Sequence, residues 1–448
     1  MAVPPVSVPW RRDPRLAAAV LGALLAHGGL LFAGSPARTY DAYVHIFFAE
    51  HYVRDWFSTW EPGWYTGFTV TSYPPGSHQA IAVASRIVGL ETGFAVVQLA
   101  ALVALVVGVY RFARCWTDDR SAGWAALLTV ASSSVAEAVH VFGQLPTTVS
   151  LALLLNAQPS IRRWIVDGDR ADLLAAIALV GATTASHHVT TLFGSVFFTG
   201  PTVVRALLDR WGAALPDEVD GHAVRLDRSV LGPVLARRIR RVGPATWRVA
   251  VLGVATVGTL VVVVLPYWLW SSSDPITQVP IPHGSRSDFL DDTNAGLVFW
   301  LVPWASVLLL VPVALVRASW SRMWPLAASV TLLLVLGTGG TTPIPRLLLG
   351  GAFDILTLDR FTIWATIAVL PLIGTCVTSL EAGRARAWLA ENLGRYAVAA
   401  AAVIITSTAV ASSLFAATLS QYRPLQPAAI EPAPIADFLA KDDHDRWR

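Results

Sequence analysis

The sequence is poor in charged residues, cysteine and lysine, and the shortage of charge already excludes a large class of proteins. Only 14% of its 448 residues are charged, whereas ordinary soluble domains carry about 25%. More than half of the residues, 54%, are hydrophobic, and the mean hydropathy is +0.55. A soluble enzyme with one large core is therefore excluded, and the composition predicts a polytopic membrane protein.

The rare residues give no sign of a disulfide framework or of several common kinds of site. The two cysteines, Cys115 and Cys376, are too few for a disulfide framework and belong to no metal-binding motif. Lys441 is the single lysine against 32 arginines, a bias that we attribute to genome composition and not to mechanism. The chain also contains no GxxxxGKS or GxxxxGKT phosphate loop, no HExxH and no CxxC. It therefore carries no signature of an ATP-driven pump.

Long apolar runs predict eleven membrane-spanning helices. Their expected ranges are residues 16–34, 92–114, 122–141, 146–161, 171–188, 189–205, 247–270, 295–317, 323–340, 361–380 and 395–417. With the N-terminus in the cytoplasm, 23 of the 33 Lys and Arg residues fall on the cytoplasmic side, as the positive-inside rule requires. This distribution explains the pI near 9.0 without nucleic acid as a partner. We predict a plasma (inner) membrane protein with an extracytoplasmic C-terminus.

The segment 76–90 is apolar but short, and its reading decides the topology. Counting it as a span would invert every later loop, so we expect a helix that lies in the outer interface. We divide the chain into a transmembrane domain, 1–420, and an outer linker, 421–448. The domain includes a first outer loop at 35–91 and a basic cytoplasmic loop at 206–246. The linker is either a short cap or the start of an extracytoplasmic domain.

The first outer loop gathers polar and aromatic side chains at one membrane face. Asp41 and His45 lie four residues apart, so on a helix they share one face. Such a pair suits a general base with its orienting partner, or two ligands of a divalent ion, and a solvated helix face is the plain alternative. Trp60, Trp64 and Tyr73 suit stacking on a sugar, although interfacial belts use the same rings.

Further polar residues lie at the predicted outer ends of later spans. Arg360 follows Asp359 at the start of a span, where a lipid phosphate would lie, and Arg346 lies in the loop before it. The arginine fork binds phosphate oxygens bidentately, so we expect Arg360, and second Arg346, to bind phosphate; snorkelling anchors are the alternative. Glu137, a carboxylate within a span, is either functional or part of packing. The expected substrate contacts on this face are His187, His188 and His283.

These features occur in an order that resembles a known superfamily. One span is followed by an outer loop that opens with Asp41 and His45, continues through Trp60, Trp64 and Gly67, and ends in Tyr73-Pro74-Pro75 before the interfacial segment. The sequence resembles the GT-C superfamily of membrane glycosyltransferases, and within it the branch labelled "6-pyruvoyl-tetrahydropterin synthase-related" membrane protein. Further matches are Gly143-Gln144-Leu145-Pro146 at an outer tip and Asp359-Arg360-Phe361 at the start of a late span.

The resemblance implies an all-α GT-C-like enzyme. Members of this superfamily transfer a sugar from a polyprenyl-phosphate carrier to a lipid, glycan or protein acceptor at the outer leaflet. The matching position implies that Asp41 is the catalytic base or a ligand of a divalent metal, Mg or Mn, with His45 beside it. Several branches carry two adjacent acidic residues here, whereas Ala42 follows Asp41 in this chain. A flippase of lipid-linked glycans and a non-catalytic GT-C-like scaffold remain the alternatives.

Overall fold

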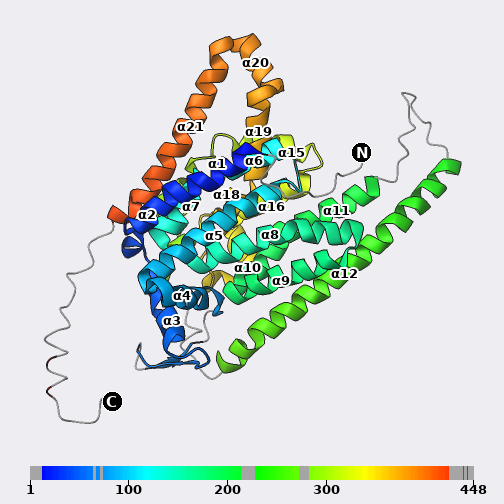
Figure 1. Cartoon of the computed structure of the whole chain (residues 1–448). Coiled ribbons are helices and arrows are strands. Elements are labelled where there is room, and N and C mark those ends of the chain that lie inside the picture. The colour runs from blue at the N-terminus through cyan, green and yellow to red at the C-terminus, as the bar shows by residue number, and fades with distance from the viewer. Residues whose placement is uncertain are drawn as a thin grey trace.

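The structure, a computed structural model, describes residues 13–63, 67–70, 74–212, 228–271 and 282–422, together with positions 437 and 441. Within these residues the chain is almost entirely helical (Figure 1). Two short strands, β1 (Trp60–Glu61) and β2 (Phe68–Thr69), pair antiparallel in the first outer loop. The predicted all-α fold is therefore confirmed.

The helices follow one another with short connections. The first span and first outer loop contain α1 (Pro14–Gly22), η2 (Ala23–His27), α2 (Gly28–Phe32), η3 (Ser35–Arg38), α3 (Ala42–Arg54) and α4 (Gly76–Val88). The next part contains α5 (Leu90–Ala113), α6 (Asp119–Val130), α7 (Ser133–Glu137), η4 (Ala138–Phe142), α8 (Leu145–Asp167), α9 (Arg170–Ser186), α10 (His188–Gly194), η5 (Ser195–Thr199) and α11 (Gly200–Gly212).

The remaining helices complete the bundle. They are α12 (Arg228–Ser271), η7 (Gly284–Arg286), α13 (Thr293–Gly296), η8 (Leu297–Leu301), α14 (Val302–Ala305), α15 (Val311–Ser319), α16 (Trp324–Leu336), α17 (Pro343–Leu349), η9 (Gly350–Asp354), α18 (Asp359–Ala368), α19 (Leu370–Ala382), α20 (Arg384–Leu393), α21 (Arg395–Thr418) and η10 (Leu419–Tyr422). In Figure 1, α12 runs along one side of the bundle, and α20 and α21 form a hairpin that projects from it.

Seven helices in the described part of the chain are long and apolar enough to cross a membrane. They are Pro14–Phe32, Leu90–Ala113, Asp119–Phe142, His188–Gly212, Arg238–Pro266, Asp359–Ala382 and Arg395–Gln421, and Trp324–Leu336 is a shorter apolar helix. The other predicted spans also fall on helices: 146–161 on α8, 171–188 on α9, and 295–317 on α13 to α15, which turns interrupt. The chain is a multi-pass helical membrane protein.

One boundary differs clearly from the expectation. Helix α12 begins at Arg228, well before the predicted span at 247–270, so part of the predicted basic loop is helical. Arginine is a good helix former, and an apolar run seeds a helix that continues into such a sequence. Hydropathy marks where a helix enters lipid and does not mark where the helix starts.

The segment expected to be an interfacial helix is helical and packs beside the site. Helix α4 starts after Pro75 and ends at Gly89, whose φ of 81° few other residues adopt. A Cβ on Gly76 would lie 2.8 Å from the carbonyl oxygen of Ala185, so only glycine allows this close approach to the end of α9. The contact brings the first outer loop against the junction between α9 and α10.

The main core runs through the bundle and fixes the start of α18. Phe361 is fully buried, and its ring meets those of Phe193 and Phe197 edge to face at 5.6 and 5.9 Å. Trp364, one turn later, is also fully buried. These aromatic contacts leave the first turn of α18, with Arg360, in a defined position at the surface of the core.

Candidate functional site

Residues 142–144, which the sequence analysis expects on the outer side and which are called the outer tip here, join two parts of the chain that are far apart in sequence. The carbonyl of Phe142 accepts a hydrogen bond from the backbone N–H of Asp41 at 2.9 Å. The side-chain amide of Gln144 donates to Asp359 Oδ2 at 2.9 Å. The outer tip therefore holds both the predicted base and the residue next to the predicted phosphate-binding arginine.

Gly143 makes this junction possible. Its φ is 70°, and a Cβ at this position would lie 2.6 Å from the hydroxyl of Thr39 and 3.1 Å from the backbone nitrogen of Ala42. Any larger residue would push the outer tip away from the start of α3. The motif Gly-Gln that the sequence resemblance singled out thus has a structural reason at both of its positions.

Arg360 lies at the start of α18, on the face of the bundle that is predicted to be outer. Its Nε donates to the Thr357 carbonyl at 2.8 Å and its Nη2 donates to the Thr357 hydroxyl at 2.9 Å. Its charge acts on the rings of His187, His188 and His283. Three of the histidines predicted from the sequence are therefore gathered around the predicted phosphate-binding arginine.

His187 and His188 mark a break between two helices. His187 ends α9 in an extended conformation and precedes α10, and its Nδ1 lies 2.9 Å from the hydroxyl of Thr190. The two rings are 6.2 Å apart at 35°. The chain breaks between α9 and α10 at these residues, and the Arg360 charge acts on both rings.

His283 is fixed to the start of α18 through one serine. Its Nδ1 accepts hydrogen bonds from the Ser285 hydroxyl at 2.8 Å and from the Ser285 N–H at 3.2 Å. The same hydroxyl oxygen accepts from the N–H of Leu358 at 2.8 Å. Burial lowers the pKa of His283, and the charges of Asp359 and Arg360 act on it in opposite directions. The ring is therefore neutral near pH 7 and able to offer its other nitrogen to a ligand.

Helix α3 begins directly after Asp41, so His45 lies in its first turn and Asp41 precedes it. Asp41 is the N-cap residue, and its carbonyl accepts from the N–H of His45 at 3.0 Å. The His45 ring turns to α4, where its Nδ1 lies 3.1 Å from Nε2 of His78. Burial lowers the pKa of His45 to about 3 and, with the neighbouring ring, holds that of His78 well below its usual range.

A second buried network in the same loop was not predicted. The Glu61 carboxylate is fully buried and accepts from Arg54 at 2.8 Å and from the Gly63 N–H at 2.7 Å. His51 Nδ1 lies 2.9 Å from it, and His51 Nε2 donates to the Ser58 carbonyl at 2.8 Å. Burial raises the pKa of Glu61, but these hydrogen bonds outweigh it and hold the pKa below its usual value. The network fixes β1, and with it Trp60, against α3.

A histidine pair supports the outer tip from inside the bundle. His27 Nε2 donates to the carbonyl of Val130, and its Nδ1 accepts from Nε2 of His140, both at 2.9 Å. His140 Nδ1 accepts from the Ser35 hydroxyl at 3.0 Å. The two rings are stacked, and each lies in a π-helical segment, a feature frequent at functional sites. The pair ties the first span to η4 and so to the segment before Asp41.

The remaining predicted residues have varied surroundings. Trp60 is 54% exposed and covers Gly67, where a Cβ would lie 2.3 Å from its ring. Arg346 forms an exposed ion pair with Asp354 at 3.1 Å and stacks over Phe353. Trp64 and Tyr73 lie outside the described residues.

Two carboxylates beneath the outer tip stand out among the described residues. Glu137 is fully buried, and neither of its oxygens has a hydrogen-bond partner there. Asp359 is also buried, its Oδ1 has no such partner, and its charge acts on Glu137. Buried polar groups usually find partners, so these oxygens require an explanation other than packing.

The described residues do not fit the predicted divalent metal. No group of three or more His, Cys, Asp or Glu side chains among them could hold an ion. One ring nitrogen of His45 is already engaged with His78, and Mg and Mn prefer oxygen ligands. We therefore assign no chemical step to a metal, and the proposed ligand role of Asp41 stays a prediction.

Comparisons with known proteins bear on the fold. No model of a protein family matches the sequence, and no curated protein does. Among solved structures, the chain is similar to the archaeal oligosaccharyltransferase AglB from Archaeoglobus fulgidus in complex with an inhibitory peptide and a dolichol-phosphate, at 15% identity and a TM-score of 0.53 over 91% of this chain and 55% of that one. The apo form of the Archaeoglobus fulgidus oligosaccharyltransferase is similar at 14% identity and a TM-score of 0.53, over 98% of this chain and 59% of that one.

A further likeness is to ArnT from Cupriavidus metallidurans bound to undecaprenyl phosphate, at 12% identity and a TM-score of 0.48 over 91% of this chain and 69% of that one. The chain spans little more than half the length of the oligosaccharyltransferase structures. At such identities the likeness concerns the fold alone, and the pterin-synthase-related branch stays a prediction. The likeness confirms the expected all-α polytopic fold, which this chain shares with the matched part of the archaeal oligosaccharyltransferase structures.

Proposed function

We propose that this protein is a glycosyltransferase that moves a sugar from a polyprenyl-phosphate carrier to an acceptor hydroxyl at the outer face of the membrane. The observation that carries the proposal is the outer tip, which binds the backbone of Asp41 on one side and the side chain of Asp359, next to Arg360, on the other. A base and a phosphate-binding cation on one rigid support are what sugar transfer from a phosphate requires.

The reaction can be written with these groups. The Asp41 carboxylate accepts the proton of the acceptor hydroxyl, whose oxygen forms a bond to the anomeric carbon of the sugar. The bond between that carbon and the phosphate oxygen breaks, and the polyprenyl phosphate leaves with the electron pair. Arg360 offsets the charge that develops on the phosphate. His45, neutral and held by His78, acts as a positioning residue for α3 and not as a second base.

The other predicted residues have secondary roles in this proposal. His187, His188 and His283 surround the phosphate position and offer ring nitrogens to the phosphate or the sugar. Trp60, with Trp64 and Tyr73, stacks on the sugar or the acceptor. Arg346 is a second, more exposed phosphate contact. The acceptor is a lipid, glycan or protein, the N-terminus is cytoplasmic, and the tail at 421–448 lies outside the membrane.

The test is transfer of radiolabelled sugar from polyprenyl-phosphate donors in membranes that contain the protein. We expect Asp41→Asn to lower the initial rate by at least about 100-fold, the usual worth of a general base. The control is Asp291→Asn, which changes an exposed outer-loop carboxylate and should leave the rate unchanged.

Full activity of Asp41→Asn would overturn the proposed base. Incorporation that is the same with and without the protein, over several donor sugars, would instead favour a flippase or a non-catalytic scaffold.

A further inference from the structure

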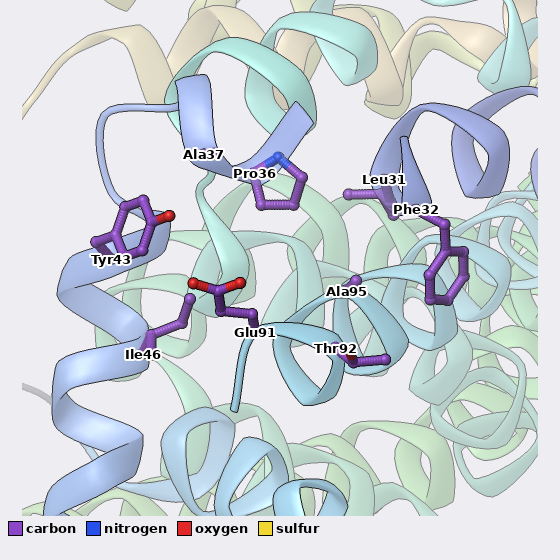
Figure 2. A pocket seen from close by; sticks show the side chains of 9 residues that line it. All are labelled: Leu31, Phe32, Pro36, Ala37, Tyr43, Ile46, Glu91, Thr92 and Ala95. Atoms are coloured by element: carbon purple, nitrogen blue, oxygen red, sulfur yellow. The ribbon is translucent and has the colours of Figure 1, made fainter. Parts of the chain in front are cut away.

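A small pocket opens on another face of α3 from the one that carries His45. It has a volume of about 150 Å³ and lies between the end of the first span, η3, α3 and the first turn of α5. Figure 2 shows Leu31 and Phe32 on one wall, Tyr43 on the opposite wall, and Pro36 above them. The pocket therefore lies where the first span leaves the hydrocarbon region.

Two polar groups in this pocket have no partner among the described residues. Figure 2 shows the Glu91 carboxylate and the Tyr43 hydroxyl at the pocket, with the carboxylate extending toward the tyrosine. Neither side chain forms a hydrogen bond or ion pair within the described part of the chain, and both residues are exposed, Tyr43 to 52%. An acidic residue in the first turn of a helix complements the helix dipole. That role does not explain why the carboxylate faces an apolar-walled pocket beside a phenol.

An apolar strip leads down from the pocket along the first span. Leu21, Leu25 and Phe32 are 56%, 68% and 56% exposed, and they recur four and seven residues apart, which places them on one side of the span. Because this span crosses the membrane, the strip faces lipid chains. A lipid that lies against the strip has its headgroup at the level of the pocket.

The charges near the pocket match one kind of headgroup. Glu91 supplies a negative charge to the pocket, while Arg38 is exposed on η3, the same short helix that supplies Pro36. A zwitterionic phospholipid with a primary ammonium carries the complementary pair, an ammonium for the carboxylate and a phosphate for the guanidinium. Aromatic rings such as Tyr43 and Phe32 add favourable contacts to a cation. An anionic glycerol headgroup has no ammonium, so it offers no positive charge to the Glu91 carboxylate.

We propose that this pocket binds the ammonium headgroup of an outer-leaflet phospholipid of the phosphatidylethanolamine type. Glu91 and Tyr43 accept hydrogen bonds from the ammonium, Arg38 meets the phosphate, and one acyl chain lies along the strip. The pocket wall is connected to the start of α3, because the Pro36 carbonyl accepts from Thr39, and the Thr39 hydroxyl accepts from the N–H of Ala42. A bound lipid would therefore brace the segment that leads to Asp41, a consequence that rests on the proposed function.

The experiment measures lipid binding and does not depend on enzyme activity. The full-length protein in detergent receives equal amounts of phosphatidylethanolamine and phosphatidylglycerol, and native mass spectrometry counts the lipids retained. We expect the wild type to retain phosphatidylethanolamine several-fold over phosphatidylglycerol. Glu91→Gln should bring the two lipids to nearly equal retention, because the variant loses the charged hydrogen bond to the ammonium. The matched control, Glu50→Gln, changes an exposed carboxylate on α3 that does not line the pocket and should keep the preference.

A second variant tests the pocket itself. Thr92 lines the pocket and is exposed, so Thr92→Trp fills the space without disturbing the core, and it should also abolish the preference. Equal retention of the two lipids by the wild type, or an unchanged preference in Glu91→Gln or Thr92→Trp, would overturn the proposal. Transfer activity of the same variants is measured separately, so that failure of the proposed function leaves the binding result intact.

Discussion

The carboxylates at the two ends of the helix bundle have opposite surroundings. At the predicted cytoplasmic end, Glu381 of α19 accepts hydrogen bonds from Arg15, Arg120 and Trp124 at 2.8, 2.9 and 2.7 Å. At the outer end, Glu137 is fully buried, and neither oxygen has a hydrogen-bond partner among the described residues. Only one helical span separates the two, because Arg120 and Trp124 lie on α6 and Glu137 on α7.

The difference between Glu381 and Glu137 distinguishes a carboxylate with a structural role from a candidate for a functional one. The Glu381 cluster connects α1, α6 and α19, and its hydrogen bonds satisfy the carboxylate. The pair Arg163–Asp172 does the same for α8 and α9. A polar group within a membrane protein that lacks partners is costly and is a functional candidate by default. We infer that the charges at the predicted cytoplasmic end hold helices together, whereas those beneath the outer tip are kept for a substrate or a proton.

The largest expected difference between the two ends concerns their arginines. Arg360→Gln should lower kcat/KM for sugar transfer by about 100-fold, since the variant loses charge stabilisation at the leaving phosphate, and should leave the melting temperature nearly unchanged. Arg120→Gln should show the reverse, a lower melting temperature with unchanged activity per folded molecule. Rate and thermal-unfolding measurements on both variants test this. If Arg360→Gln and Arg120→Gln lost the same activity per folded molecule, the proposed contrast between the two ends of the bundle would be wrong.

A smaller effect is expected from the outer tip. Gln144→Leu removes the hydrogen bond to Asp359 while keeping a side chain of similar size, and we expect about a tenfold lower kcat from misplacement of the phosphate-binding turn. The control is Gln158→Leu on α8, the helix that begins directly after Gln144; the Gln158 amide donates within the bundle to the Leu154 carbonyl and the Thr199 hydroxyl. Initial rates over a range of donor concentrations separate kcat from KM. An unchanged kcat for Gln144→Leu would show that the outer tip does not position the site.

Much of the fold could be predicted from the sequence, because hydropathy and the arginine distribution act along the chain. Asp41 and His45 were expected to share a helix face, but α3 begins at Ala42, so Asp41 caps the helix and only His45 lies within it. Helix α12 was predicted too short because its arginines carry no hydropathy signal but still favour a helix. The sequence therefore predicted those features of the fold that depend on residues close together in the chain.

The candidate site could be predicted only in parts. Gly143-Gln144 and Asp359-Arg360 were each singled out, but their contact spans 215 positions, and no local pattern indicates such a pair. The Glu61 network was missed because its members look like ordinary loop charges until they are buried. A glutamate and a histidine ten residues apart across a helix end carry no spacing rule, so sequence reasoning offered no signal for them.

The outer end should also respond to pH more strongly than the predicted cytoplasmic end. Since burial lowers the pKa of His45 to about 3, the unfolded chain binds more protons than the folded one below the ordinary value of about 6.5. The contribution of this ring to the free energy of unfolding is therefore fully present above about pH 6.5 and is lost as the pH falls toward 3. Between pH 7.5 and 5.5 the loss is about 1.4 kcal/mol. Thermal unfolding in detergent at the two pH values measures the loss.

The variant His45→Gln isolates the contribution of this ring. Glutamine keeps a hydrogen-bonding side chain but does not titrate, so the difference in melting temperature between pH 7.5 and 5.5 should become smaller. The His78 ring titrates in the same direction, because its pKa is also lowered by burial, and a residual pH dependence is therefore expected. A pH dependence that His45→Gln leaves unchanged would mean that the ring is accessible to protons in the folded state.

The smallest expected effect compares the two carboxylates directly. Glu381→Gln should lower the free energy of unfolding by less than about 1 kcal/mol, because the side chain is 30% exposed and water screens its ion pairs. Glu137→Gln should leave that free energy unchanged or raise it, since an amide costs less to bury than an unpartnered carboxylate. Chemical unfolding of both variants measures the sign of the change in the free energy of unfolding for each. If Glu137→Gln destabilises the protein more than Glu381→Gln does, then Glu137 is a structural residue, and the contrast between the two ends of the bundle does not hold.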